Sequence, residues 1–170
     1  GGPAFWTTFG SRDPDARQRA VEVAEAGMDA VAAMGGDTLL IVPGRWEGDQ
    51  TYSDMWDHAL DTARRVAELA EHRGITVALE NVENRFLLSP PEWHAFLDAV
   101  GSKRVRMYFD VGNTWRMGRG WPEQWLRELA RDYIHRIHFK DAHEFAPVSY
   151  LLEGGVNWPA VAAAIREIGY

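Results

Sequence analysis

The 170-residue chain contains no cysteine, which excludes disulfide bonds, thiolate metal ligands and a cysteine nucleophile. It has no apolar run approaching the roughly 20 residues that a membrane-spanning helix needs. Its amino-terminal residues also lack the basic and apolar regions of a signal peptide. We therefore expect a cytoplasmic protein without a membrane partner.

A basic surface is missing as well, since the formal net charge is -7 and charges of both signs are mixed along the helical segments. Nucleic acid is therefore not an expected partner, because binding to phosphate backbones depends on clustered Lys and Arg. The chain is 46% apolar and 12% aromatic, which suffices for one sizeable core. We expect residues 1–170 to form a single domain.

Short apolar runs alternate with longer segments of helical period. The expected strands cover residues 4–9, 38–42, 76–80, 105–110 and 134–140. The expected helices cover residues 14–34, 52–72, 90–100, 121–131 and 158–168, and several begin with a capping residue followed by proline. Strict alternation predicts an α/β fold with parallel strands and right-handed crossovers, in about five consecutive βα units.

Two architectures fit five such units. A doubly wound open sheet would be complete at this length, whereas a (β/α)8 barrel needs about 250 residues and would be partial. No Gly-rich phosphate loop follows the first expected strand, as a nucleotide-binding sheet would usually show. Polar residues at several neighbouring strand ends favour the barrel, which brings such residues together on its axis.

Glu80 and Asp110 each end an apolar strand, and His138 and Lys140 lie at the matching level of the next strand. A charge in that position is costly unless something compensates it, and one divalent cation would compensate both carboxylates at once. The spacings of 30 and 28 residues equal one βα unit, so Glu80, Asp110 and His138 can converge. Two carboxylates and an imidazole suit Mn²⁺, Zn²⁺, Co²⁺ or Mg²⁺.

Each of these residues also has a simpler interpretation. Glu80 can pair with a neighbouring Arg or Lys, Asp110 can cap a helix or form a turn, and His138 can be a core histidine. Lys140 can be a surface lysine that extends over the rim. His135 lies on the opposite face from His138, toward the helices if His138 points inward, and is the weaker candidate.

Three segments carry a resemblance to a known family. They are Ala-Leu-Glu-Asn-Val-Glu-Asn-Arg-Phe-Leu-Leu-Ser-Pro (78–90), Tyr-Phe-Asp-Val-Gly-Asn (108–113) and Ile-His-Phe-Lys-Asp (137–141). They resemble the xylose isomerase-like TIM barrel superfamily, and within it the sugar-phosphate isomerase/epimerase branch. That branch includes L-ribulose (L-xylulose) 5-phosphate 3-epimerases and hexulose-6-phosphate isomerases. The resemblance extends from Ala4 to Tyr170.

The resemblance implies one divalent metal ion, Mn²⁺ first, held by Glu80, Asp110 and His138. It implies epimerisation or isomerisation of a ketose, expected to be phosphorylated, by proton abstraction alpha to the carbonyl through an enediolate. Glu80 would be one catalytic base. The family's fourth ligand and second base, a Glu on the eighth strand, would follow Tyr170. The chain would then span the third strand to the seventh helix, and alone it would lack a complete metal site.

Other branches of the superfamily place a His three residues after the Asp, where this sequence has Asn113. The difference argues against free-ketose epimerases and against endonuclease-like phosphodiesterases that cleave damaged DNA. Asn113 is expected either to bind a sugar hydroxyl or to be a plain loop amide, and Lys140 to contact a hydroxyl or phosphate. The alternative functions are an AP endonuclease-like metal phosphodiesterase and a non-catalytic sugar-binding barrel remnant.

Two further expectations concern the tryptophans and the state of association. Three tryptophans near strand ends or loops are expected to wall a sugar pocket: Trp6, Trp46 and Trp115. Three on helices are expected to pack in the core: Trp56, Trp93 and Trp125. A partial barrel exposes two unpaired strand edges and apolar surface, so we expect the chain to form a homo-oligomer or to aggregate.

Overall fold

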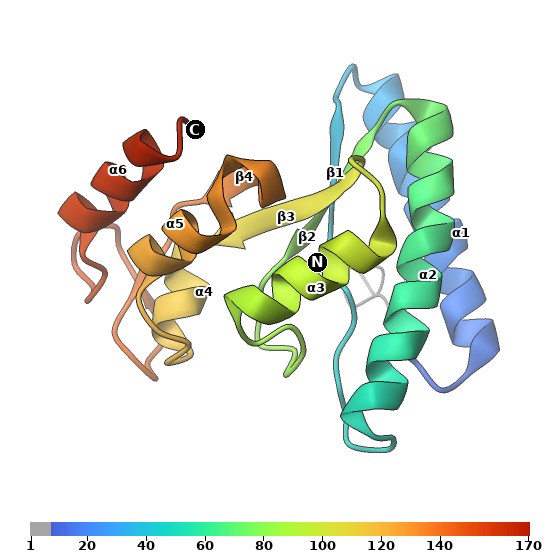
Figure 1. Ribbon diagram of the computed structural model, residues 1–170, viewed down its shortest axis with the longest axis horizontal. Helices are drawn as coiled ribbons and strands as arrows, with labels where there is room; N and C mark the ends of the chain where they lie inside the picture. The colour runs from blue at the N-terminus through green and yellow to red at the C-terminus, as the bar shows by residue number, and fades with distance from the viewer. Residues whose placement is uncertain (1–7) are drawn as a thin grey trace.

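A computed structural model describes residues 8–170 (Figure 1). Its helices are α1 (Pro14–Ala33), α2 (Tyr52–Arg73), α3 (Pro90–Val100), α4 (Val111–Arg116), α5 (Pro122–Tyr133) and α6 (Trp158–Glu167). Its strands are β1 (Thr38–Ile41), β2 (Thr76–Glu80), β3 (Val105–Asp110), β4 (Ile134–His138), β5 (Asp141–Ala142) and β6 (Val148–Ser149). The strand expected at residues 4–9 begins outside the described residues, and Thr8 and Phe9 are not in a strand.

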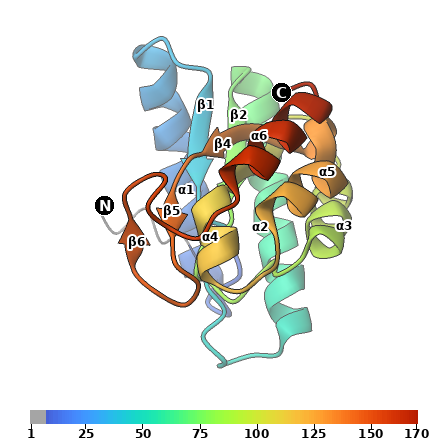
Figure 2. The same ribbon diagram turned by 90° about the vertical axis from the view of Figure 1, so that its left-hand side faces the viewer.

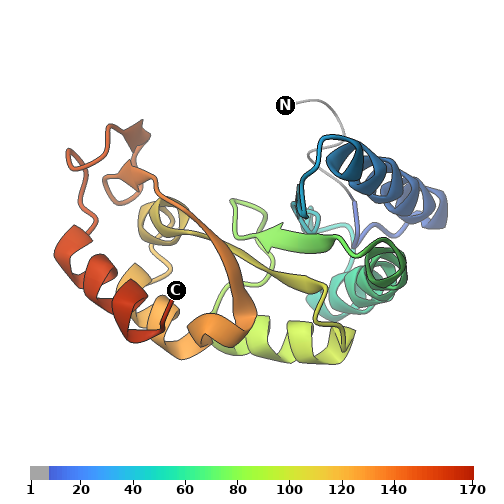
Figure 3. The ribbon, with the colours of Figure 1, turned by 90° about the horizontal axis from the view of Figure 1, so that it is seen from above.

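The first four of these strands form one parallel sheet in the order β1-β2-β3-β4, which confirms the predicted α/β fold. Seen from above, the helices form an arc around one side of this sheet (Figure 3). Strands β5 and β6 pair with each other as a small antiparallel ribbon, apart from the parallel sheet and beside α4 (Figure 2).

Local signals explain where the helices begin and end. Asp13 caps α1 by accepting a 2.9 Å hydrogen bond from the backbone N–H of Asp15. A capping box joins Thr51 and Asp54 at the start of α2. Gly74 ends α2 with a φ of 66°, a conformation that glycine adopts without strain. None of the helices in residues 8–170 has both the length and the apolar character needed to cross a membrane.

Side chains along β3 alternate between the two faces of the sheet. Val105, Met107 and Phe109 are buried, and the ring of Phe109 stacks 6.2 Å from that of Trp125 on α5. The residues between them face the other way, so Asp110 lies on the face opposite the helices. The core therefore occupies the helical side of the sheet, and the other face is left for polar groups.

The face opposite the helices is concave. Thr38 on β1 and His135 on β4 lie at opposite edges of the sheet, yet Thr38 Oγ1 is 2.8 Å from His135 Nε2. Arg136 likewise pairs with Asp37 at 3.1 Å. The two edges thus curl toward each other, as in part of a barrel. His135 contacts β1 across this face, so the expectation that it points toward the helices is wrong.

A register shift in β4 explains that error. Ile134 pairs with Met107, and Arg136 pairs with the next residue of β3, so His135 is an extra residue at a bulge. The bulge lets Ile134 face the core while His138, four residues later, faces the concave side. β4 also ends at His138 rather than at Lys140, because its partner residue Asp110 is the last residue of β3.

The tryptophan expectations meet different outcomes. Trp93 and Trp125 are buried, and Trp56 packs edge-on between Phe86 and Phe96, so these three contribute to the core as predicted. Trp46 and Trp115 are half-buried and also pack against the core. Their role as walls of a sugar pocket stays a prediction, and Trp6 lies outside the described residues.

Candidate metal centre

The parallel sheet brings Glu80, Asp110 and His138 to one edge. They are the last residues of β2, β3 and β4, three adjacent strands. Asp110 and His138 are also paired directly in the register of β3 and β4. Active sites of βα barrels lie at this carboxyl end of the strands.

Their side chains meet above the sheet. His138 Nδ1 lies 2.9 Å from Glu80 Oε1 and 3.8 Å from Asp110 Oδ2, and one ligand atom from each residue lies within 4.8 Å of the others. Glu80 and Asp110 are buried, whereas the side chain of His138 is 40% exposed. The group is therefore a buried pair of carboxylates that an imidazole covers from the solvent side.

The two carboxylate oxygens of Asp110 have different partners. Oδ1 accepts a 2.7 Å hydrogen bond from the backbone N–H of Asn113 and so caps α4, a short helix that was not expected. Oδ2 is buried and accepts no hydrogen bond from any residue in 8–170. Its near neighbour is Lys140, whose Nζ forms an ion pair with it at 2.6 Å without hydrogen-bond alignment. Within residues 8–170, Oδ2 thus has the Lys140 ammonium as its counter-ion and no hydrogen bond.

The electrostatics of Glu80 favour a cation in the same place. Burial raises the pKa of Glu80, and the hydrogen bond from His138 partly offsets that rise. The nearby Asp110 carboxylate raises the pKa further, and the Lys140 ammonium lowers it. Two carboxylates so close together are costly to keep charged. A divalent cation between them would remove that cost.

Lys140 and Asn113, the two expected substrate-binding residues, lie beside the carboxylates. Lys140 Nζ is 3.3 Å from Asn113 Oδ1, and Asn113 Nδ2 donates to the backbone carbonyl of Asn81 at 2.9 Å. Asn113 is buried within α4, so it is not a plain loop amide. Only its Oδ1 faces Lys140 and the centre.

The residues present fit a divalent metal ion. Neighbouring ligands placed about 2.0–2.2 Å from one cation lie roughly 2.8–3.6 Å apart in octahedral or tetrahedral geometry. Of the separations from His138 Nδ1, 2.9 Å lies within this range and 3.8 Å is slightly longer. The donors are oxygen and nitrogen, which suits the metals expected from the sequence.

Comparison with known proteins agrees with this geometry. The family described as Xylose isomerase-like TIM barrel matches residues 2–170. The chain belongs to this family. The match places the curled parallel sheet within a barrel whose strand ends carry the candidate centre.

Individual relatives in the family are distant. Putative L-ribulose-5-phosphate 3-epimerase SgbU of Escherichia coli is 26% identical in an alignment that covers 95% of this chain and 58% of that protein. The 2-epi-5-epi-valiolone 7-phosphate 2-epimerase of Actinoplanes sp. is 33% identical over 125 residues, covering 72% of this chain and 44% of that protein. The chain thus spans about half the length of these curated relatives.

A solved structure shows the same fold. The crystal structure of a D-tagatose 3-epimerase-like protein matches with a TM-score of 0.86 at 23% identity. The match covers 96% of this chain and 63% of that chain. The chain therefore forms part of a TIM barrel, as predicted.

Sequence reasoning missed Asn81, which ties the ends of β2 and β3 together. Asn81 Oδ1 accepts from the backbone N–H of Asp110 at 2.7 Å. Its Nδ2 donates to the Asp110 carbonyl and to Thr114 Oγ1, both at 3.0 Å. The position of this amide, directly after the candidate ligand Glu80, is the sequence signal that could have indicated its role. Asn81 therefore holds the backbone from which the Asp110 carboxylate projects.

Asp141 is a second missed residue. Its buried carboxylate accepts hydrogen bonds from three backbone N–H groups and, at 2.7 Å, from Trp158 Nε1. The backbone donors are those of Ala142, Leu152 and Val156. These contacts fold residues 142–158 back onto Asp141, the first residue of β5. Asp141 thus shapes the loop next to Lys140 without joining the centre.

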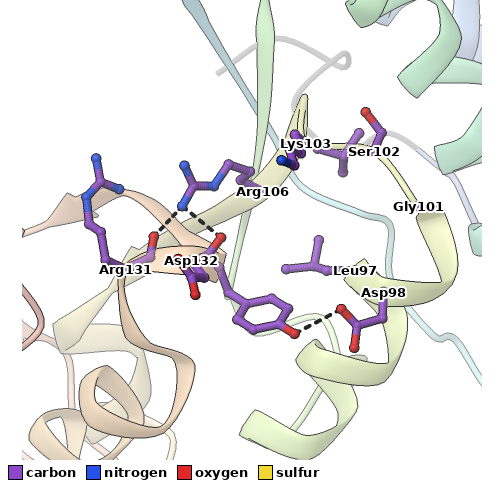
Figure 4. A pocket seen from close by; sticks show the side chains of 10 residues that line it. Leu97, Asp98, Gly101, Ser102, Lys103, Arg106, Arg131 and Asp132 are labelled. Carbon is purple, nitrogen blue, oxygen red and sulfur yellow. Dashed lines mark hydrogen bonds between the residues drawn. The ribbon is translucent and has the colours of Figure 1, made fainter.

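A cavity of about 810 Å³ lies at the other end of the strands, between the ends of α3 and α5 (Figure 4). Arg106 reaches along it and donates to the backbone carbonyls of Arg131 and Asp132. Asp98 accepts from the hydroxyl of Tyr133 at 2.9 Å. These hydrogen bonds hold the carboxyl-terminal end of α5 in place, so the polar groups of the cavity have a structural role. The cavity lies at the opposite end of the strands from the candidate centre.

Proposed function

We propose that this chain carries most of the metal centre of an enzyme that epimerises or isomerises a ketose, expected to be a ketose phosphate. The observation that carries the proposal is the convergence of Glu80, Asp110 and His138 at three consecutive strand ends, where Asp110 Oδ2 accepts no hydrogen bond from the described residues 8–170. Membership in the xylose isomerase-like family and relatives named as sugar-phosphate epimerases support the reaction class.

Glu80, Asp110 and His138 would hold the metal ion. A divalent cation bound there would polarise the ketose carbonyl and stabilise the negative charge that develops during proton transfer. We assign Mn²⁺ as the first candidate, with Zn²⁺, Co²⁺ and Mg²⁺ as alternatives. The donor set of two carboxylates and one imidazole supports this range.

The chain's own residues would position the sugar and move the proton. Glu80 would take the proton from the carbon next to the carbonyl. Asn113 Oδ1 would accept a hydrogen bond from a sugar hydroxyl. Lys140 would contact a hydroxyl or phosphate oxygen. Inversion also requires a second base on the other face of that carbon.

Deuterium exchange tests the proposal. The chain is incubated with Mn²⁺ and each of two epimeric ketopentose 5-phosphates in D₂O, and deuterium at C3 is measured by NMR. With Glu80 as the one base, we expect exchange in one epimer without conversion to the other. Glu80→Gln should reduce exchange by at least 100-fold, while Glu83→Gln, a charge-matched change in the following loop, should leave it unchanged.

The outcomes separate the functions considered. No Mn²⁺-dependent exchange in either epimer, together with retained sugar binding, would support a sugar-binding barrel remnant instead. Cleavage of an abasic-site oligonucleotide under the same conditions would support a metal phosphodiesterase. Exchange that persists in Glu80→Gln would remove Glu80 from the mechanism.

A further inference from the structure

Asp110 Oδ2, which accepts no hydrogen bond within residues 8–170, has a positive charge beside it. Lys140 Nζ lies 2.6 Å from Asp110 Oδ2, which is also one of the atoms that could bind the proposed metal ion. Oδ1 is engaged by the backbone of Asn113, so Oδ2 is the atom that both cations would share. Lysine and metal therefore compete for one atom.

We propose that Lys140 is a built-in counter-ion, which neutralises Asp110 in the absence of metal and swings away when the metal binds. The inference rests on the proposed metal centre. A cation about 2.0–2.2 Å from Oδ2 would lie within roughly 5 Å of Nζ. Two positive charges at that separation repel each other, and the repulsion is stronger beside buried carboxylates than in bulk water.

The structure allows the Lys140 side chain to move away from Asp110 Oδ2. Its side chain is 32% exposed, so it can turn toward solvent. Its backbone packs closely against α4, because a Cβ added at Gly112 would lie 2.6 Å from the Lys140 carbonyl oxygen. Asn113 Oδ1, already 3.3 Å from Nζ, stays within reach as the second partner. Metal binding would thereby release an ammonium group next to the substrate position.

The lysine content of the chain makes this movement measurable. The sequence has two lysines, and Lys103 is an exposed residue at the other end of β3. We expect brief acetylation with limiting N-acetoxysuccinimide, followed by peptide mass spectrometry, to modify Lys140 at least fivefold faster in saturating Mn²⁺ than in chelator. The rate at Lys103 should change less than twofold and serves as the internal control.

A matched pair of variants tests the competition itself. Lys140→Met removes the charge and keeps the length, and we expect it to bind Mn²⁺ at least tenfold more tightly than the unaltered chain in calorimetry. Lys103→Met should leave the affinity unchanged. If Lys140→Met does not fold, the acetylation experiment on the unaltered chain still decides.

Each outcome has one meaning. If the unaltered chain binds Mn²⁺ but the Lys140 acetylation rate does not rise, or Lys140→Met binds no more tightly, the counter-ion role is wrong and the metal centre stands. If Lys140→Met binds Mn²⁺ and the unaltered chain does not, the competition is supported in its strongest form. If both fail to bind Mn²⁺, the metal centre and the inference fall together.

Discussion

Replacing Asn81 with alanine should destabilise the fold and weaken the candidate metal centre at the same time. The Asn81 side chain is 1% exposed and makes three hydrogen bonds to Asp110 and Thr114. Two of them bind the backbone N–H and C=O of Asp110, on either side of its carboxylate. Without them the end of β3 is no longer anchored to the end of β2.

The size of the effect follows from these contacts. Each hydrogen bond contributes about 1 kcal/mol net, and the buried N–H of Asp110 left without its partner costs about 1–3 kcal/mol. The carbonyl of Asp110 keeps a hydrogen bond from Thr114 Oγ1 at 3.1 Å, so it adds little. We therefore expect Asn81→Ala to lower the free energy of unfolding by about 3–5 kcal/mol, a large part of the stability of a typical domain.

Urea unfolding and Mn²⁺ titration measure the two effects, and Asn84→Ala is the matched control. Asn84 is equally buried in the same loop, but its side chain binds Gly44 and Phe86 and none of the centre residues. We expect Asn84→Ala to lose about 1–3 kcal/mol and to keep its Mn²⁺ affinity, while Asn81→Ala loses at least tenfold in affinity. A loss below about 1 kcal/mol in Asn81→Ala, or equal losses of affinity in both variants, would refute the reasoning.

Two further predictions concern stability. Burial, reinforced by the Arg136 and Arg106 cations, lowers the pKa of His135 to about 4, below its unfolded value of about 6.5. The stability that neutral His135 contributes is therefore complete above pH 6.5 and is lost as the pH falls toward 4. Urea unfolding of the unaltered chain should show a drop in the free energy of unfolding between pH 7 and 4.5 that is about 1–2 kcal/mol larger than the drop in His135→Gln. Equal losses would contradict this. Gly154→Ala should lower the free energy of unfolding by about 1–3 kcal/mol, because the added Cβ would lie 2.0 Å from Asp141 Oδ1. An unchanged melting temperature would contradict this prediction.

The parts of the fold that depend on local signals could be predicted from sequence. The bounds of β2 and β3 agree residue for residue with the expectation, and α3 ends where Gly101 adopts a φ of 76°. The predicted convergence of strand-end residues also follows from simple geometry, since one βα unit returns the chain to the neighbouring strand. These features need no knowledge of distant contacts.

The features that escaped prediction depend on pairing between segments far apart in sequence. The bulge at His135 arises from the register of β4 against β3, and strict alternation places the histidine on the wrong face. The donors around Asp141 come from residues up to 17 positions away. Helix α4 follows β3 without a loop, so a hydrophobic pattern alone does not separate the two elements.

The alternatives weighed for Asp110 also turn out to be compatible. Helix capping and metal binding were opposed interpretations of one residue. In the structure the Oδ1 atom caps α4, and Oδ2 remains beside Glu80 and His138. Sequence can suggest either role, but only the placement of the separate oxygen atoms shows that one does not exclude the other.

This division of the Asp110 carboxylate has a consequence for which ions the centre prefers. With Oδ1 held by the N–H of Asn113, Asp110 can offer a cation one oxygen rather than two. Calcium fills a shell of six to eight oxygens and often draws on carboxylates that bind through both. Smaller ions need fewer donors at shorter distances. In the proposed metal centre, the helix cap would therefore favour ions smaller than calcium.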